Sequence, residues 1–435
     1  MYSPSIVGRR LYAAKKRGMK YQRLPRDKSI EIAAKLERLQ YKDNKRLPEG
    51  QLIRPLDDRE VSFIQSERLL CQCDFVYYFE RYHKLQLDPG VVELIDTAGT
   101  VESVIDGSLQ KIGPPRMLES QCRYIELIGR REAECMAEWN KYHFCTGILA
   151  VFHKCRQVAA TATARGLTMH RMIFWPGTRA FAASVDAPRI TELFARDHLA
   201  ADNLPFWLKP SQFLPDVKDT ELGFPAPLSS RCGYQAENQQ AGGIGVGTQQ
   251  DVSHLTEVAL WQYPGRIKFS FLPALPKAIT TLHIEESTSD GKGNYWHELS
   301  EAVRHKKEGY ESWIYAFIPW WYNRLKYRDI PPLDWAPAAH TLRHAELIER
   351  SSPEFYDGNT YHPTIEQLFW WQTERARHVQ QGELATFLTN YPATPEQSFQ
   401  SPNQGALPVE LIEEMETEIL PPEVSFELEP VAQAG

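Results

Sequence analysis

Short apolar runs alternate with amphipathic segments through the middle of the chain. Residues 148–152 form an apolar run typical of a strand buried on both faces, and a helix is predicted to begin near Thr161. A second strand is predicted at 179–185, and strongly apolar residues at 313–322 predict a later one. The alternation of strands and helices over residues 145–320 predicts an α/β fold with a mostly parallel central sheet and flanking helices.

Helical periodicity predicts a helical region before this sheet. Apolar positions three and four apart indicate a helix over residues 29–41, and further helices are expected to begin near Pro55 and Pro114. Residues 85–113 and 203–250 are expected to be irregular.

The second irregular stretch contains the glycine cluster Gly242-Gly-Ile-Gly-Val-Gly-Thr. We interpret it as a hairpin or turn, because no helix follows it and no acidic residue stands about 20 residues further on in a βαβ unit.

Composition places the chain among ordinary globular proteins. It has 435 residues, of which 42% are hydrophobic and 24% charged. No apolar run approaches the roughly 20 residues of a membrane helix, so no membrane association is expected. Seven cysteines without paired C-x-x-C spacing indicate reduced thiols rather than disulfides or a zinc site.

The net charge of −7 conceals an asymmetry along the chain. Residues 1–26 contain eight Lys or Arg and no acidic residue, which is typical of an arm that either contacts phosphate backbones or is simply solvated. The last thirty residues are acidic, and the prolines from Pro402 onward indicate a linker.

The stretch from Gly147 to Ala164 has the strand, loop and helix layout that binds phosphate groups. It lacks both glycines and the lysine of the standard GxxxxGK[ST] loop. An ordinary buried strand that enters a helix is therefore the alternative interpretation.

Two later segments end predicted strands with polar side chains. Glu257 stands about a hundred residues after the loop, and the hydroxyls of Ser287 and Thr288 follow thirty residues later. An NTPase needs phosphate-binding groups, a hydroxyl on Mg²⁺, a carboxylate to orient water and a polar sensor, in separate segments of this kind. Each residue alone also fits a simpler interpretation, as a surface glutamate or a pair of turn residues.

Five motifs occur in a specific order. Lys154-Cys-Arg-Gln-Val-Ala-Ala-Thr, His254-Leu-Thr-Glu-Val-Ala-Leu-Trp and Glu286-Ser-Thr-Ser-Asp-Gly-Lys-Gly-Asn are followed by Phe317-Ile-Pro-Trp-Trp-Tyr and Tyr391-Pro-Ala-Thr-Pro-Glu-Gln-Ser-Phe. The set resembles the large terminase subunit of tailed bacteriophages, the ATPase that packages DNA. The first three are similar to that family's divergent Walker A (K-x-R-Q-x-G-x-[ST]), Walker B (H-L-S-E-x-A-x-W) and motif III.

The resemblance implies a site for ATP and Mg²⁺ within a P-loop NTPase-type fold. Lys154 and Arg156 would compensate for the missing loop lysine on the phosphates, Thr161 would hold Mg²⁺, and Glu257 would polarise the attacking water, with Arg156 as its catalytic partner. Ser287 and Thr288 would couple loss of the γ-phosphate to motion. The nucleotide-binding residues would be Gln121, Lys154, Arg156, Gln157, Val158, Ala159, Ala160, Thr161 and Ala162, with Gln121 reading adenine and Tyr124 positioned to stack on it.

Three departures from the family pattern affect this site. Ala159 replaces a glycine, so a left-handed backbone would be strained there. Ala160 stands where other NTPases have lysine. Thr256 replaces the Walker B aspartate, which predicts one carboxylate fewer around the metal.

The resemblance implies a motor that translocates double-stranded DNA into a viral procapsid, in the host cytoplasm at the procapsid portal. Its expected partners are double-stranded DNA, the portal protein, the small terminase subunit and further copies of itself in a ring, with a monomer expected in isolation. We expect a basic arm and helix at 1–50, an ATPase domain at 51–401 and a linker at 402–435. The family's nuclease domain needs about 100–150 residues more, so no nuclease activity is expected.

Two other functions stay open. A helicase-like DNA-dependent ATPase is disfavoured by the absence of a DEAD-type box and of an obvious second RecA-like domain. A non-hydrolysing module that docks a portal or small subunit would follow if the altered loop had lost the nucleotide.

Overall fold

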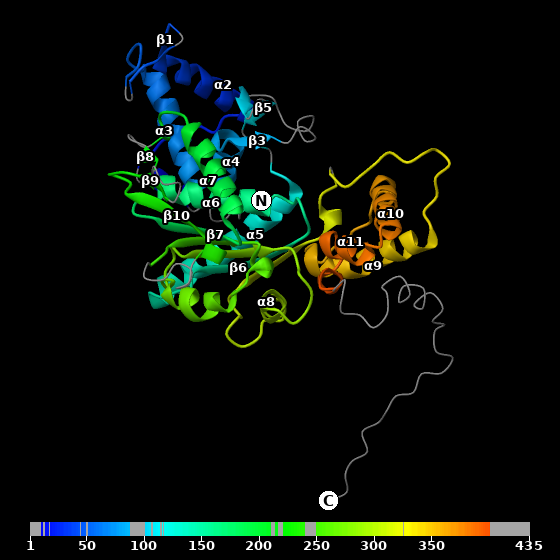
Figure 1. The fold of residues 1–435 in the computed structure, drawn as a ribbon. Coiled ribbons are helices and arrows are strands. Elements are labelled where there is room, and N and C mark those ends of the chain that lie inside the picture. Colours follow the sequence, from blue (N-terminus) through cyan, green and yellow to red (C-terminus); the bar gives the residue numbers. More distant parts are fainter. Residues whose placement is uncertain are drawn as a thin grey trace, which may run out of the picture.

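The computed structural model shows one central sheet covered by helices on both faces, with further helices at the two ends of the chain (Figure 1). It describes residues 10–11, 14–16, 18–43, 45–48, 51–87, 101–105, 108–113, 115, 117–209, 214–215, 221–239, 249–324 and 326–400.

The sheet has eight strands in the order β13-β6-β12-β11-β7-β10-β9-β8. The strands from β13 to β10 pair in parallel, and β9 and β8 add an antiparallel edge. The predicted mostly parallel sheet is therefore confirmed. The bounds are β6 Ile148–Lys154, β7 Arg179–Ser184, β8 Leu214–Pro215, β9 Glu221–Phe224, β10 Ser230–Ala236, β11 Val252–Thr256, β12 Leu282–Ser287 and β13 Ile314–Ile318.

Alternate residues of the buried strands face two hydrophobic cores. Ala150 and Phe152 of β6 belong to the core beneath α5 (Glu119–Tyr142), α6 (Ala160–Phe174) and α7 (Ala187–Asp202). Val151 faces the opposite core, beneath α8 (Tyr295–Arg304) and the short helices that follow β11. Burial of both faces explains why β6 is a continuous apolar run.

The strand order reverses at β6. The chain crosses from β6 through α6 to β7 on one side of the sheet, and later from β12 through α8 to β13 on the other side. In open parallel sheets, ligands bind at the carboxyl ends of the strands beside such a reversal. The loop after β6 occupies this position.

The N-terminal region is helical, as predicted. It contains α2 (Arg26–Glu37), α3 (Asp58–Cys73) and α4 (Phe75–Tyr82), together with the short strands β1 (Tyr41–Lys42) and β2 (Lys45–Arg46). Asp57 caps α3 in a capping box with Glu60. Within the basic arm, Arg10 pairs with Glu132 and Arg23 with Asp74, so two of its cations bind the folded body.

Two stretches expected to be irregular contain strands. A separate sheet consists of β3 (Leu85–Leu87), β4 (Val101–Ile105) and β5 (Ser108–Gly113), and β8, β9 and β10 lie within residues 203–250. These two predictions were wrong. The glycine cluster at 242–248 lies outside the described residues.

The C-terminal helices α9 (Ala339–Phe355), α10 (Ile365–Gln380), α11 (Leu384–Asn390) and α12 (Pro395–Ser398) form a cluster beside β13 (Figure 1). Stacked aromatic rings join it to the segment that follows β13: Trp321 lies on Tyr361 and Trp320 on His344, with centroid separations of 4.6 and 5.9 Å. Residues 402–435, the predicted linker, lie outside the described residues.

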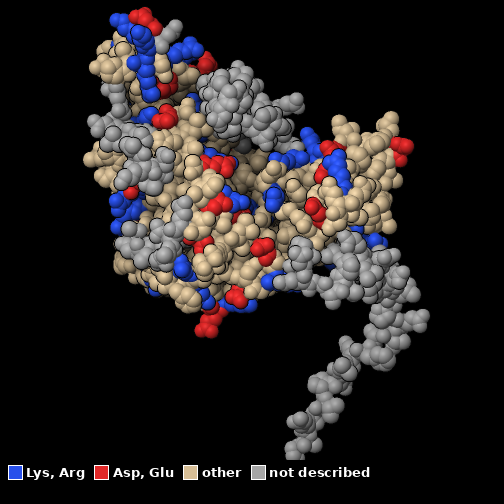
Figure 2. Space-filling model, in the orientation of Figure 1, with Lys and Arg blue, Asp and Glu red and all other residues tan. Residues whose placement is uncertain are grey.

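All seven cysteines are free, as predicted. Among the described helices, none combines the length and the apolar character that crossing a membrane requires. Acidic and basic side chains are interspersed over the face shown in Figure 2.

Candidate nucleotide-binding site

The carboxyl ends of three neighbouring strands bring polar side chains together. Lys154 is the last residue of β6, Thr256 the last of β11, and Glu286 lies near the end of β12 between them. The register places Glu286 beside Phe152 on one side and beside Thr256 on the other. Residues that are far apart in the sequence therefore meet at one edge of the sheet.

Glu286 is the centre of this cluster. Its Oε1 atom accepts hydrogen bonds from Thr161 Oγ1 at 2.5 Å, Thr256 Oγ1 at 2.8 Å and His254 Nε2 at 3.0 Å. Its Oε2 atom is buried without a hydrogen-bond partner among the described residues, and Lys154 Nζ lies 3.4 Å away. The carboxyl group is fully buried, so these contacts fix its orientation.

Electrostatics keep the cluster charged. Burial opposes ionisation of Glu286, but Lys154 and the hydrogen bonds from His254 and Thr161 hold its pKa well below the usual range. Burial likewise opposes the charge on Lys154, whereas Glu286 and Glu257 raise its pKa. Lys154 Nζ lies 3.1 Å from Glu257 Oε1, so one ammonium group joins two carboxylates.

His254 contributes as a neutral donor. Burial lowers its pKa despite the neighbouring carboxylate. Because Nε2 faces Glu286 while Nδ1 is buried without a hydrogen-bond partner among the described residues, the tautomer protonated on Nε2 satisfies the contact.

The loop between β6 and α6 has the backbone of an anion site. Gln157 and Ala159 both have positive φ angles, of 57° and 58°, and Ala159 precedes the first turn of α6. No side chain in the described part of the chain caps this helix, so its first N–H groups remain for a ligand. Val158 is buried, and its carbonyl accepts a hydrogen bond from Ser120 Oγ at 3.0 Å.

The two cations proposed from the sequence point in different directions. Lys154 joins the carboxylates, whereas Arg156 is exposed, and its Nε donates to Asn390 Oδ1 at 2.9 Å. The backbone N–H of Arg156 also donates to the carbonyl of Asn390, and Tyr327 donates to the carbonyl of Arg156. The geometry thus links Arg156 to the C-terminal helices and Lys154 to the site.

Gln121 lies in the first turn of α5, close to the loop that Ser120 contacts. Its Oε1 accepts the backbone N–H of Leu118 at 2.9 Å, and the residue is buried. Tyr124 does not fit its expected role. Its ring is fully buried and stacks on Phe152 with a centroid separation of 4.1 Å, so its face is already covered.

The end of β12 contacts both the loop after β11 and the C-terminal helices. Ser287 Oγ accepts the backbone N–H of Ala259, just beyond Glu257, at 3.2 Å. Thr288 is half-buried, and Ser289 Oγ lies 2.9 Å from Ser398 Oγ of α12. A change at the carboxyl edge can therefore reach both the loop after β11 and the C-terminal helices.

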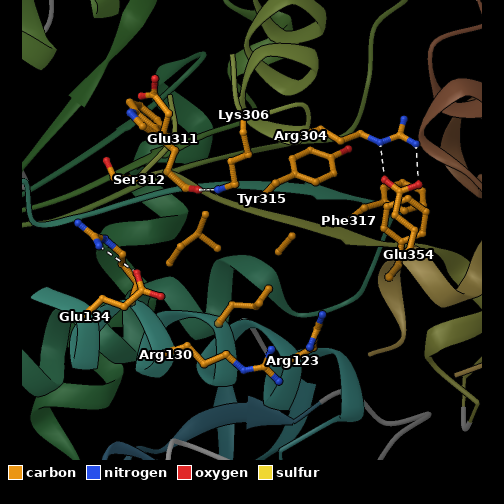
Figure 3. Close-up of a pocket in the computed structure, with 16 residues that line it drawn as sticks. Arg123, Arg130, Glu134, Arg304, Lys306, Glu311, Ser312, Tyr315, Phe317 and Glu354 are labelled. Carbon is orange, nitrogen blue, oxygen red and sulfur yellow. Dashed lines mark hydrogen bonds and ion pairs between the residues drawn. The ribbon is translucent and has the colours of Figure 1, made fainter. Parts of the chain in front are cut away.

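A cavity of about 480 Å³ lies elsewhere, along the outer edge of β13 (Figure 3). Its walls come from α5, from α8 and the residues after it, and from the end of α9. Arg304, on one wall, points toward both oxygens of Glu354 and also pairs with Glu396. This cavity is separate from the cluster at the carboxyl edge, because Lys154, Thr161, Glu257 and Glu286 do not line it.

Sequence reasoning missed Glu286 and His254 as site residues. Both open a recognised motif, and both stand on strands whose ends were already assigned to the site. The replacement of the Walker B aspartate by Thr256 could have pointed to Glu286. When one strand end lacks the expected carboxylate, the end of the neighbouring strand is the next position that can supply one.

Comparisons with known proteins gave structural neighbours only. No protein-family model and no curated protein matches the chain. The fold is similar to the large terminase of bacteriophage HK97, with 13% sequence identity and a TM-score of 0.41 over 67% of this chain and 50% of that one. The present chain therefore spans about half the length of that protein.

The ATPase domain of the Thermus phage P74-26 large terminase is a second neighbour, with 15% identity and a TM-score of 0.34 over 46% of this chain and 85% of that one. An arginine mutant of that domain matches with 13% identity and a TM-score of 0.34, over 41% of this chain and 78% of that one. At these values, we rest the functional proposal on the motifs and the site geometry.

Proposed function

We propose that this protein is an ATP-hydrolysing motor that translocates double-stranded DNA into a viral procapsid. One observation supports this most directly: Lys154, Thr161, Glu257 and Glu286 converge beside the uncapped N-terminus of α6, where the strand order reverses. Cations, a hydroxyl and carboxylates around a helix N-terminus are the groups that NTP hydrolysis needs.

The donor set fits a nucleotide with Mg²⁺. The N–H groups of residues 157–162 face the phosphates in this proposal, and Gln121 faces the base. Thr161 and the carboxylates supply oxygen atoms, which are the ligands that Mg²⁺ takes alongside phosphates and water. When bound, the metal would neutralise charge on the phosphate oxygens.

Catalysis by this chain would rest on position and charge. Lys154 would stabilise negative charge that develops on the phosphates. Glu257, whose side chain is 24% exposed, would accept a hydrogen bond from the attacking water and orient it in line. Both groups are held in place by their mutual ion pair before substrate arrives.

Changes at the nucleotide site would reach DNA through residues at the edge of that site. Ser287 and Thr288 would respond to loss of the γ-phosphate, and Arg156 would carry changes in the loop to Asn390 and the C-terminal helices. The portal protein, the small terminase subunit and a ring of identical copies at the procapsid portal are the partners of this proposal, with the host cytoplasm as its location.

Glu257→Gln tests the catalytic assignment. We expect DNA-stimulated ATP hydrolysis to fall by about 10²-fold or more, because the neutral amide cannot polarise the water. ATP should still raise the melting temperature of the variant, because a ligand that binds only the native state stabilises that state. Glu298→Gln, at an exposed position on α8, is the matched control. Undiminished hydrolysis by Glu257→Gln would refute the role of Glu257.

A second experiment separates the motor from its rivals. ATP-dependent displacement of a third strand from a DNA triplex, without separation of the duplex, is the result expected of a translocase. Duplex separation would favour a helicase, and the absence of any Mg-ATP stabilisation would favour a docking module. Duplex binding should weaken steeply with salt, because phosphate contacts release counterions.

A further inference from the structure

The strand that should carry the metal-side carboxylate ends in a hydroxyl. In P-loop NTPases, a loop Ser or Thr and an aspartate at the end of a neighbouring strand hold Mg²⁺. Thr256 stands at that strand end, and its Oγ1 donates to Glu286 Oε1 at 2.8 Å. The Glu286 carboxylate therefore lies within hydrogen-bond distance of the side chain at position 256, where such an aspartate would stand. This carboxylate comes from β12 instead of β11.

The contacts of Glu286 match those of a metal-side carboxylate. The Thr161 hydroxyl, in the first turn of α6, lies 2.5 Å from Glu286 Oε1. Glu286 Oε2 is fully buried and accepts no hydrogen bond from the described residues, and the Lys154 ammonium group lies 3.4 Å away as its ion-pair partner. Mg²⁺ takes one or two carboxylate oxygens beside hydroxyl, phosphate and water ligands, and this pair of side chains offers both kinds of oxygen.

The two glutamates of the site differ in access. Glu257 follows β11 with a φ of 55° and a side chain that is 24% exposed, whereas Glu286 is fully buried. Water can reach Glu257, while Glu286 is held by three donors on one oxygen. The roles of water activation and metal binding therefore fall on different strands.

We propose that Glu286 is the metal-side carboxylate of the site, in place of an aspartate at position 256, and that His254 and Thr256 are positioning residues that hold it. The inference rests on the proposed nucleotide-binding function. From the sequence, the replacement of the Walker B aspartate by Thr256 predicts one carboxylate fewer around the metal. In this proposal β12 supplies that carboxylate through Glu286.

The test measures Mn²⁺ binding by electron paramagnetic resonance in the presence of ADP, with ADP binding measured separately without metal. Glu286→Gln should weaken Mn²⁺ binding by about tenfold or more and should leave metal-free ADP binding within about twofold of wild type. Glu285→Gln is the matched control, because Glu285 is the adjacent buried glutamate but contacts His283 and Tyr295 instead.

A swap of the carboxylate tests position directly. Thr256→Asp combined with Glu286→Thr returns the carboxylate to β11, and Mn²⁺ binding should recover to within about threefold of wild type. For His254, the readout is a double-mutant cycle: His254→Gln should weaken Mn²⁺ binding, but should add nothing further to Glu286→Gln. A purely structural role would weaken ADP binding as well.

The outcomes separate this inference from the function on which it rests. If wild type binds Mn²⁺ with ADP and Glu286→Gln binds it equally well, Glu286 is not the metal-side carboxylate. If wild type binds no ADP at millimolar concentration, the proposed function fails as well. Should Glu286→Gln not fold, Glu286→Asp keeps the charge and shortens the side chain. Mn²⁺ binding as strong as in wild type would then contradict the proposal.

Discussion

Three residues at the carboxyl edge of the sheet have left-handed backbones without being glycine. Gln157, Ala159 and Glu257 have φ angles of 57°, 58° and 55°. An L-residue in this region costs roughly 1–2 kcal/mol, and such strain clusters at functional sites. Ala159, for which the sequence predicts strain in a left-handed conformation, adopts that conformation directly before α6.

Ala159→Gly should therefore stabilise the protein. Relief of left-handed strain outweighs the extra chain entropy of glycine, which costs roughly 0.5–1 kcal/mol. We expect the free energy of unfolding to rise by about 0.5–1 kcal/mol in urea denaturation. Ala162→Gly, within α6 and with ordinary helical backbone, should lower it instead. Equal destabilisation by both substitutions would show that position 159 is unstrained.

For individual residues, the sequence predicted which side chains belong to the candidate site better than it predicted their contacts. Lys154, Thr161 and Glu257 meet as a shared site requires, although their roles remain predictions. Glu286 was not predicted as a site residue, because its hydrogen-bond partners His254, Thr256 and Thr161 lie 32, 30 and 125 residues away in the sequence. Only strand order and register, which a single sequence does not state, place them together.

At the scale of elements, buried strands and periodic helices were predictable, and short antiparallel strands were missed. The stretch that forms β4 and β5 carried a signal: two runs flank Asp106-Gly107, a dipeptide typical of two-residue hairpin loops. The antiparallel strands β9 and β10 had no comparable marker. Their pairing depends on β7, to which β10 adds in parallel.

Arg304 joins three elements across the end of the β13 cavity. From the C-terminus of α8 it binds both carboxylate oxygens of Glu354 on α9, with Nε and Nη2 at 2.7 and 2.9 Å, and it also pairs with Glu396 on α12. Its side chain is 10% exposed, so the pairing is shielded more than a surface pair.

Arg304→Met should destabilise the chain by about 1–2 kcal/mol, because two carboxylates lose a bidentate partner. The check is urea unfolding together with hydrogen exchange, which should become faster in α9 and α12. Arg196→Met removes an exposed pair with Glu192 on α7 and should change stability by no more than about 0.5 kcal/mol. Similar effects of the two substitutions would mean that Arg304 does not bind these helices together.

At the scale of the whole molecule, the predicted α/β architecture holds because the central strands are buried on both faces. Two cores, one beneath α5, α6 and α7 and one beneath α8, account for this double burial. The same burial encloses titratable groups. Burial lowers the pKa of His83 to about 4 and that of His153, His170 and His344 to about 3.

These four histidines should make the fold sensitive to mild acid. In the unfolded chain a histidine binds a proton near pH 6.5, whereas the folded protein resists it until about pH 3 to 4. Between these values the unfolded state holds more protons, so stability falls as pH falls, by about 1.4 kcal/mol per pH unit for each histidine. Glu37 and Glu67, whose pKa burial raises, act in the opposite direction at lower pH.

Urea unfolding from pH 7 to pH 5 measures this dependence, and His344→Gln tests its origin. His344 is buried beside Trp371, and its Nε2 accepts a hydrogen bond from Trp320 Nε1, an interaction that the glutamine amide oxygen can replace. The substitution should reduce the slope of stability against pH by about 1.4 kcal/mol per unit near pH 5, where the unfolded histidine is almost fully protonated, and by less toward pH 7. His305→Gln, at a histidine whose side chain is 54% exposed, should leave the slope unchanged. If His344→Gln leaves it unchanged too, proton uptake by this buried histidine does not drive the loss of stability in acid.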